Sequence, residues 1–266
     1  MNHLPNWASE VIASYESQSA GCFLLHGNVN DRLLITPPKE SPRLGNLRDF
    51  ILETLVPRFD VVITFDMGFG LRVDRGSDIF SEWKTYADAP QLPHKPLDAC
   101  RFVSKYLLYC RNLQAVGQKA PKVAFIMKQA HLACPSMPNL HNYELNSLAA
   151  LIRGWADDDR LQEFNQAAFL ISENLNGIHP LVSESPRVSH VEISLPDENA
   201  ITHSLTELAK SCPLAMQNFK DDPSVISSRL TGATLSSLEA LLKRLEHDGE
   251  ILDDNRLAGL KKTLVE

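Results

Sequence analysis

Five short runs of apolar and β-branched residues constrain the fold of this 266-residue chain more than any other feature of it. Each run has the length of one buried strand, and the segments between the runs carry apolar residues at helical spacing. Strands that alternate with helices form parallel sheets with helices on both faces. The sequence therefore predicts an α/β domain over residues 1–196 with a five-stranded parallel sheet, its strands at 22–26, 60–65, 122–127, 167–172 and 191–195.

The pattern between and after these strands is helical. Within the first domain we expect helices at 4–18, 44–55, 97–113, 142–155 and 160–164. After Pro196 no further run of strand type occurs, and amphipathic stretches follow at 197–211, 222–229, 235–245 and 257–265. We therefore expect a second, small all-helical domain over residues 197–266.

Composition excludes several classes of protein. A net charge of −7 and a pI near 5.7 argue against a broad nucleic-acid surface, which needs clustered Lys and Arg. No apolar run reaches the roughly 18 residues that span a membrane, and the N-terminus has no signal-peptide pattern, so a cytoplasmic location is expected. The five cysteines form an odd set without a CxxC pair, which favours buried free thiols over disulfides or a zinc site.

The turn after the first strand lies where a phosphate-binding loop would be found. Such a loop needs several glycines, a Lys and a Ser or Thr for magnesium. This turn has one glycine, Gly27, and neither the Lys nor the metal-binding hydroxyl. We interpret the turn as a vestigial phosphate loop, formed by His26, Gly27, Asn28, Asn30 and Asp31. Its His and Asn side chains could still offer hydrogen bonds to a nucleotide, which keeps an unconventional nucleotide site open.

The order of these parts, together with two segments, resembles the AAA+ ATPase module. Residues 187–197 are similar to the segment in which an arginine precedes the fifth strand and the strand ends in Leu-Pro-Asp. Residues 230–239 are similar to the start of a lid helix introduced by Thr-x-Gly, with Gly232 near the nucleotide. The resemblance covers almost the whole chain and implies a P-loop-type sheet followed by a helical lid.

The chain departs from this family at the catalytic positions. In active members the third strand ends in Asp-Glu, which hold magnesium and orient the attacking water. Here the strand continues into Lys128-Gln129-Ala130-His131, so both carboxylates are missing and a cation takes the place of a metal ligand. We therefore expect no ATP hydrolysis by this segment and no catalytic residue within it.

Two further residues match positions that bind nucleotide in the family. Asn174 follows the fourth strand, where a polar sensor residue is common, although Asn is also an ordinary turn residue. Arg187 corresponds to the arginine that reaches the nucleotide of a neighbouring subunit, and a solvated loop arginine is the simpler interpretation.

The segment Met67-Gly68-Phe69-Gly70 follows the second strand. By resemblance, Phe69 and Gly70 correspond to an aromatic-glycine pore loop that grips a threaded polypeptide. A plain glycine turn with Phe69 packed in the core is the simpler interpretation.

These features together predict a catalytically silent AAA+ module that supports ring assembly and binds a protein partner or substrate. We expect it to be the N-terminal part of a larger unfoldase or remodelling ATPase that forms a homo-oligomeric ring. In that case this segment holds no cofactor, and ATP and Mg²⁺ bind in a neighbouring active module. Two alternatives stay open: a free-standing inactive adaptor or clamp-loader-like subunit, and a nucleotide-binding enzyme with a non-standard phosphate loop.

Overall fold

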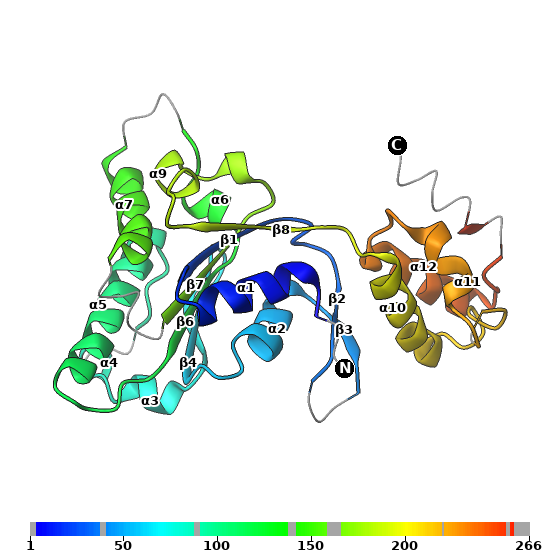
Figure 1. Ribbon diagram of the computed structural model, residues 1–266, viewed down its shortest axis with the longest axis horizontal. Helices are drawn as coiled ribbons and strands as arrows, with labels where there is room; N and C mark the ends of the chain where they lie inside the picture. Colours follow the sequence, from blue (N-terminus) through cyan, green and yellow to red (C-terminus); the bar gives the residue numbers. More distant parts are fainter. Residues whose placement is uncertain are drawn as a thin grey trace. The chain divides into compact units, whose positions relative to one another are not determined.

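The chain forms two compact units, seen here in a computed structural model that describes residues 4–37, 41–87, 91–137, 142–158, 166–219, 221–253 and 256–257. One unit, which we call the sheet unit, comprises residues 6–29 and 55–193. The other, which we call the hairpin unit, comprises the described residues of 4–5, 30–54 and 194–257. Figure 1 shows the elements of each.

The sheet unit is built on a six-stranded sheet of order β5-β4-β6-β7-β1-β8, in which only β5 is antiparallel to its neighbour. The strands are β1 (Cys22–Gly27), β4 (Val61–Asp66), β5 (Gly70–Arg75), β6 (Val123–Met127), β7 (Gln166–Ile171) and β8 (Ser189–Ile193). All five expected strands are present. The prediction of five strands was wrong by one, because β5 is a half-exposed edge strand in which polar residues interrupt the apolar pattern.

Alternate residues of the strands point to opposite faces of this sheet. One face packs against α5 (Pro96–Ala115) and α7 (Tyr143–Asp157), and Leu24, Phe65 and Phe125 lie in that core. Figure 1 shows α1 (Asn6–Glu16) on the other side of the sheet, with Trp7 buried. The shorter helices of the unit are α3 (Ser77–Ser81), α4 (Lys84–Ala87), α6 (Ala130–Ala133), η2 (Leu175–Gly177) and α9 (Pro180–Ser183).

The hairpin unit combines two distant parts of the sequence. Residues 30–54 supply the antiparallel pair β2 (Leu33–Ile35) and β3 (Arg43–Gly45), then α2 (Leu47–Phe50), which continues as the π-helical turn η1 (Ile51–Leu55). The C-terminal part supplies α10 (Glu198–Ser211), α11 (Ser224–Ser227), η3 (Ser228–Leu230) and α12 (Leu235–Asp248). Leu44 packs against the apolar core that these helices share.

This composition differs from the expected all-helical domain over 197–266. The helices expected at 197–211, 222–229 and 235–245 are present, but the unit also contains a β-hairpin. The helix expected over 44–55 begins as strand β3, because Leu44 pairs with Leu34 of β2. The expected helix at 160–164 lies outside the described residues, as does all but the first residue of the one at 257–265.

Two expectations from composition concern the whole chain. All five cysteines are buried and their thiols are free. Among the described residues, no helix has both the length and the apolar character needed to cross a membrane.

Candidate functional site

The carboxyl ends of the five parallel strands meet at one edge of the sheet, which is where ligands bind in open α/β folds. Each of these five ends carries a polar residue, either among the last two residues of the strand or directly after it: His26, Asp66, Lys128, Ser172 and Glu192. This edge is therefore the first place to look for a site in the sheet unit.

The backbone amides of the turn after β1 are already paired. Gly27 N–H donates to the carbonyl of Glu173 at 3.3 Å, and Asn28 N–H donates to that of Ile193 at 2.8 Å. Val29 N–H donates to the carbonyl of Gly27 at 2.8 Å. A phosphate loop works by pointing such amides at the ligand. These three donors are committed to the protein's own backbone.

Gly27 has a structural reason to be glycine. Its φ is +93°, and a Cβ added there would lie 2.8 Å from the carbonyl oxygen of Ile193 on β8. The described residues 28–32 form turns, and the next regular element is strand β2. Neither the helix N-terminus nor the amide cluster of a phosphate loop is therefore found in this described segment.

His26 lies beside Gly27 and is half-buried on β1, opposite Glu192 of β8 in the strand register. Burial lowers the pKa of the nearby His190, and the charge of His26 lowers it further. The His190 ring consequently stays neutral to a lower pH than a histidine with the ordinary pKa.

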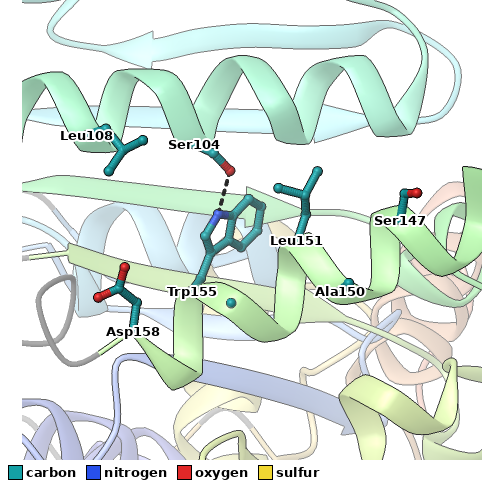
Figure 2. A pocket seen from close by; sticks show the side chains of 8 residues that line it. Ser104, Leu108, Ser147, Ala150, Leu151, Trp155 and Asp158 are labelled. Carbon is teal, nitrogen blue, oxygen red and sulfur yellow. Dashed lines mark hydrogen bonds between the residues drawn. The ribbon is translucent and has the colours of Figure 1, made fainter.

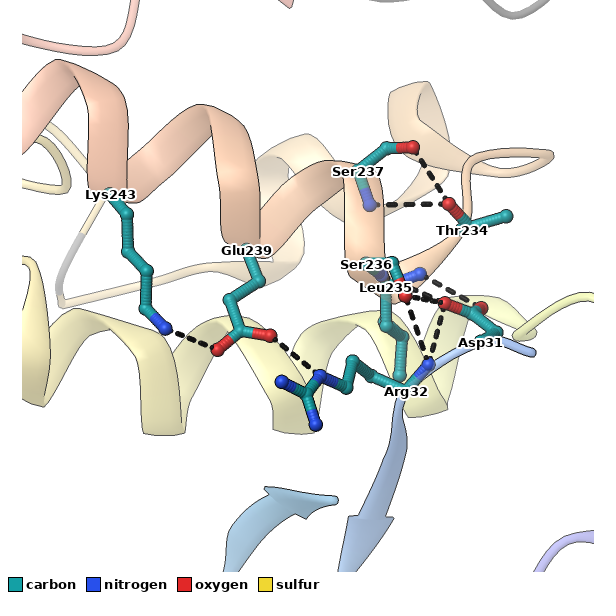
Figure 3. Close-up of polar contacts among 8 residues, drawn as sticks. All are labelled: Asp31, Arg32, Thr234, Leu235, Ser236, Ser237, Glu239 and Lys243. Carbon is teal, nitrogen blue, oxygen red and sulfur yellow. Dashed lines mark hydrogen bonds and ion pairs between the residues drawn. The ribbon is translucent and has the colours of Figure 1, made fainter. Parts of the chain in front are cut away.

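Asp31 belongs to the hairpin unit and binds the first turn of α12 (Figure 3). Its carboxylate accepts the N–H of Leu235 at 3.0 Å and both the N–H and the hydroxyl of Ser236 at 2.8 Å. It also accepts the N–H of Arg32 at 2.7 Å. Only 5% of Asp31 is exposed. The side chain that the sequence assigned to a vestigial phosphate loop is thus a buried cap of a helix 204 positions away.

The same helix start is completed by its own residues and by Arg32. Thr234 is the N-cap and accepts the N–H of Ser237 at 3.2 Å. The Arg32 guanidinium donates to Glu239 at 3.1 Å, and Glu239 also accepts Lys243 at 2.6 Å (Figure 3). A carboxylate at a helix N-terminus is favourable because the macrodipole is positive there. Asp31 therefore occupies the position in which a bound anion would otherwise be stabilised.

Gly232, which the resemblance places near the nucleotide, lies in the turn before α12. Its φ is +94°, and a Cβ added there would meet no atom of the described residues within 4 Å. The residue serves the backbone conformation of the turn, and no close approach explains it.

Lys128 follows β6 and pairs with Asp66, the last residue of the adjacent strand β4. The Lys128 ammonium lies 2.8 Å from one carboxylate oxygen of Asp66, and the other oxygen accepts the N–H of Gly68 at 2.9 Å. The hydrogen bond from Lys128 lowers the pKa of Asp66, although burial of the carboxylate opposes the shift. A fixed cation therefore lies where the family resemblance would place a metal-binding carboxylate.

The loop from Met67 to Phe69 joins β4 to β5 and presents apolar side chains to solvent. Phe69 is 73% exposed and Met67 is 42% exposed. The interpretation that Phe69 packs in the core is therefore wrong. The tight β4–β5 pairing, which begins with Asp66 opposite Gly70, turns the side chain outward.

Asn174 and Arg187 lie at different ends of the sheet unit. The Asn174 side chain accepts the N–H of Gly177 at 2.6 Å and caps η2, as a turn residue does.

Arg187 is exposed and precedes β8, so it lies at the amino end of that strand, away from the edge with Asp66 and Lys128. Gly70 pairs with Asp66, the ion-pair partner of Lys128, so the loop that holds Phe69 lies at the same edge of the sheet as Lys128, whereas Arg187 lies at the opposite edge.

Sequence reasoning missed two of these contacts. Asp66 directly follows the strand expected at 60–65 and was not singled out, yet an acid and a Lys at the ends of neighbouring strands are a usable signal for an ion pair. Ser172 and His131 also meet at this edge, with 3.4 Å between the hydroxyl and Nδ1. The Ser172 proton is donated to the carbonyl of Asn174 at 2.6 Å, so this pair has no activated nucleophile.

Among the described residues no cluster of His, Cys, Asp and Glu could hold a metal ion.

A shallow groove of about 440 Å³ lies between α5 and α7 (Figure 2). The Trp155 indole N–H donates to the hydroxyl of Ser104 at 2.8 Å across it, and Leu108 and Leu151 supply apolar walls. Its lining has one carboxylate, Asp158, and no cation. The groove therefore has the character of a helix-helix seam, without the converging polar groups of a catalytic site.

Comparison with known proteins identifies a family that this chain matches. A family model described as "AAA+ chaperone, N-terminal Rossmann-like domain" matches residues 1–194. Curated protein sequences gave no match. Among solved structures, one chain of the E. coli MS115-1 HORMA:CdnC:Trip13 complex is similar, with 17% identity and a TM-score of 0.43. The likeness covers 62% of this chain and 57% of that one, and at this level it identifies neither a function nor a partner.

Proposed function

This chain belongs to the family of AAA+ chaperones with an N-terminal Rossmann-like domain, and from that premise we propose that it is a catalytically silent module. In this proposal the module binds client polypeptide and supports ring assembly, as part of a larger AAA+ ATPase of the remodelling type. ATP and Mg²⁺ bind in a neighbouring active module, and the helices from Glu198 onward correspond to the lid.

The observation that carries the proposal is the pairing of the backbone amides after β1. Gly27, Asn28 and Val29 donate to backbone carbonyls. Phosphate binding at this turn would require these hydrogen bonds to break and the backbone to refold, because no other amide cluster is offered there. Catalysis of phosphoryl transfer is mostly positioning and charge stabilisation, so a turn without a phosphate cradle supports the absence of hydrolysis.

The charges at two further positions support the same proposal. Lys128 places a cation where the family binds magnesium, and its electrostatic repulsion disfavours a divalent ion. Asp31 places a carboxylate at the start of α12, where it would repel a phosphate. Both side chains are held by hydrogen bonds, so neither leaves its position without cost.

Binding of a client polypeptide is supported by the exposed loop of the sheet unit. An aromatic side chain that is 73% exposed contributes nothing to the core, and it offers a large apolar contact area to a partner. We propose that Phe69 and the adjacent Gly70 contact client polypeptide. Arg187 is exposed before β8, and we propose that it faces the nucleotide of a neighbouring subunit in a homo-oligomeric ring.

Titration calorimetry of the purified chain with ATP and Mg²⁺ tests the silent site. We expect binding weaker than about 1 mM, whereas a competent AAA+ ATPase gives micromolar binding under the same conditions. Sedimentation of the same samples reports whether nucleotide changes the oligomer. Micromolar binding by this chain would contradict the proposal and favour an unconventional site at His26, Asn28 and Asn30.

A further inference from the structure

One end of the Met67–Phe69 loop is fixed by a carboxylate that uses both of its oxygens. Asp66 is only 6% exposed. One oxygen accepts the N–H of Gly68 within the loop, and the other receives the Lys128 ammonium. Removal of the cation would leave a buried charge without its partner, which is costly. The loop is therefore connected to Lys128 through a single side chain.

The other end of the loop is fixed by backbone contacts. Gly70 has a φ of +73°, and a Cβ added there would lie 2.7 Å from Nδ1 of His94 and 2.9 Å from the carbonyl oxygen of Pro93. Leu71 N–H donates to that same carbonyl at 2.9 Å. With both ends held, the exposure of Met67 and Phe69 is set by the structure around the loop.

We propose that Lys128 is a positioning residue for polypeptide binding: through Asp66 it holds the Met67–Phe69 loop in the shape that presents Phe69 to an extended apolar segment of a client protein. This inference rests on the function proposed above, in which Phe69 contacts the client. A loop that is ordered before binding loses less conformational entropy when the client binds, so it binds more tightly. The residue at the expected metal position thus acts on the shape of the binding loop.

The test measures binding of the whole chain to a fluorescein-labelled peptide in which leucine and phenylalanine alternate with serine. Phe69→Ala should abolish binding, because it removes the contact itself. Lys128→Met should weaken binding roughly three- to tenfold, because the loop must now be ordered at each binding event. Lys128→Arg keeps a cation that can donate to Asp66, so it should bind within about twofold of the unchanged chain.

A second readout separates loop order from overall stability. Chymotrypsin cleaves after exposed phenylalanines, and we expect Lys128→Met to speed cleavage after Phe69 roughly tenfold. Arg153→Met is the matched control, because it removes an exposed ion pair with Asp157 on α7 of the same unit. It should change neither peptide binding nor cleavage. Asp66→Asn keeps an acceptor for Gly68 but no charge, and it provides a second variant if Lys128→Met folds poorly.

The two proposals fail in different ways. If Phe69→Ala binds the peptide as well as the unchanged chain, the loop does not contact clients, and the proposed binding function is overturned. If Phe69→Ala loses binding while Lys128→Met and Asp66→Asn keep it, the function stands and the positioning role of Lys128 is overturned.

Discussion

Two glycine turns at the same edge of the sheet differ in what they offer to a ligand. The turn after β1 directs its amides at backbone carbonyls, and Gly27 lies against the carbonyl of Ile193. The loop after β4 has its ends fixed and its apolar side chains in solvent. Glycine permits both shapes. In the first turn the backbone amides form hydrogen bonds to neighbouring backbone carbonyls, so this turn has a structural role. In the second turn the apolar side chains stay exposed to solvent, so this turn is suited to binding.

Gly27→Ala should have the largest effect, because it tests how tightly the first turn is packed. The new Cβ would lie 2.8 Å from the backbone oxygen of Ile193 at a φ of +93°. We expect a loss of about 3 kcal/mol in the free energy of unfolding, measured by urea denaturation. Gly117→Ala is the control, since its φ is +76° but, in the part of the chain that the structure describes, no atom lies within 4 Å of the added Cβ. That variant should lose only about 1 kcal/mol. Equal losses would show that backbone conformation alone explains Gly27.

Asp31→Ala tests the continuation of the first turn, where the chain caps α12. The substitution leaves the N–H groups of Leu235 and Ser236 without their acceptor. We expect a loss of about 2–3 kcal/mol, together with faster hydrogen exchange at those amides. Asp197→Ala removes the exposed cap of α10 in the same unit and should lose only about 1 kcal/mol. A smaller loss for Asp31→Ala than for Asp197→Ala would mean that the buried cap is not needed.

The pH dependence of Asp66 tests how the second turn is held. Its pKa in the folded chain is lowered by Lys128, so the carboxylate binds its proton less readily than in the unfolded chain. The resulting stabilisation is present above the unfolded pKa of about 4 and is lost as the pH falls through the lowered folded value. Carboxyl NMR titration of Lys128→Met should show a higher pKa for Asp66. An unchanged pKa would mean that the backbone amides of Gly68 and Phe69, and not the cation, control this carboxylate.

Phe69→Ala should have the smallest effect on stability. The side chain is 73% exposed, so its removal should change the free energy of unfolding by less than about 0.5 kcal/mol. Thermal unfolding checks this value. A loss typical of a core phenylalanine would show that Phe69 is packed in solution, and the contrast between the two turns would then disappear.

The central strands could be predicted because each buries an apolar run on both faces, and β4 and β6 are buried at every position. Strand β5 was missed because polar residues interrupt its apolar pattern at the sheet edge, and β3 was missed because Leu44 also fits a helical pattern. The sequence indicated that Lys128 is unusual, but its partner Asp66 is 62 positions away and becomes adjacent only through parallel pairing. Asp31 was assigned to the wrong role because its helix lies 204 positions further along the chain.

The contact between Asp31 and α12 has a consequence for biosynthesis. Because residues 55–193 of the sheet unit separate residues 30–54 from residues 194–257 in the sequence, residues 30–54 of the hairpin unit leave the ribosome long before α10, α11 and α12 exist. The sheet unit can be completed first, since domains fold as units during synthesis and local closure is faster than distant closure. During that interval residues 30–54 lack the C-terminal helices against which they pack. The Asp31 carboxylate is solvated until Leu235 and Ser236 leave the ribosome. Ribosome-bound chains of this protein should therefore pass through a stage in which the sheet unit is folded while the hairpin unit is unfolded and accessible to chaperones.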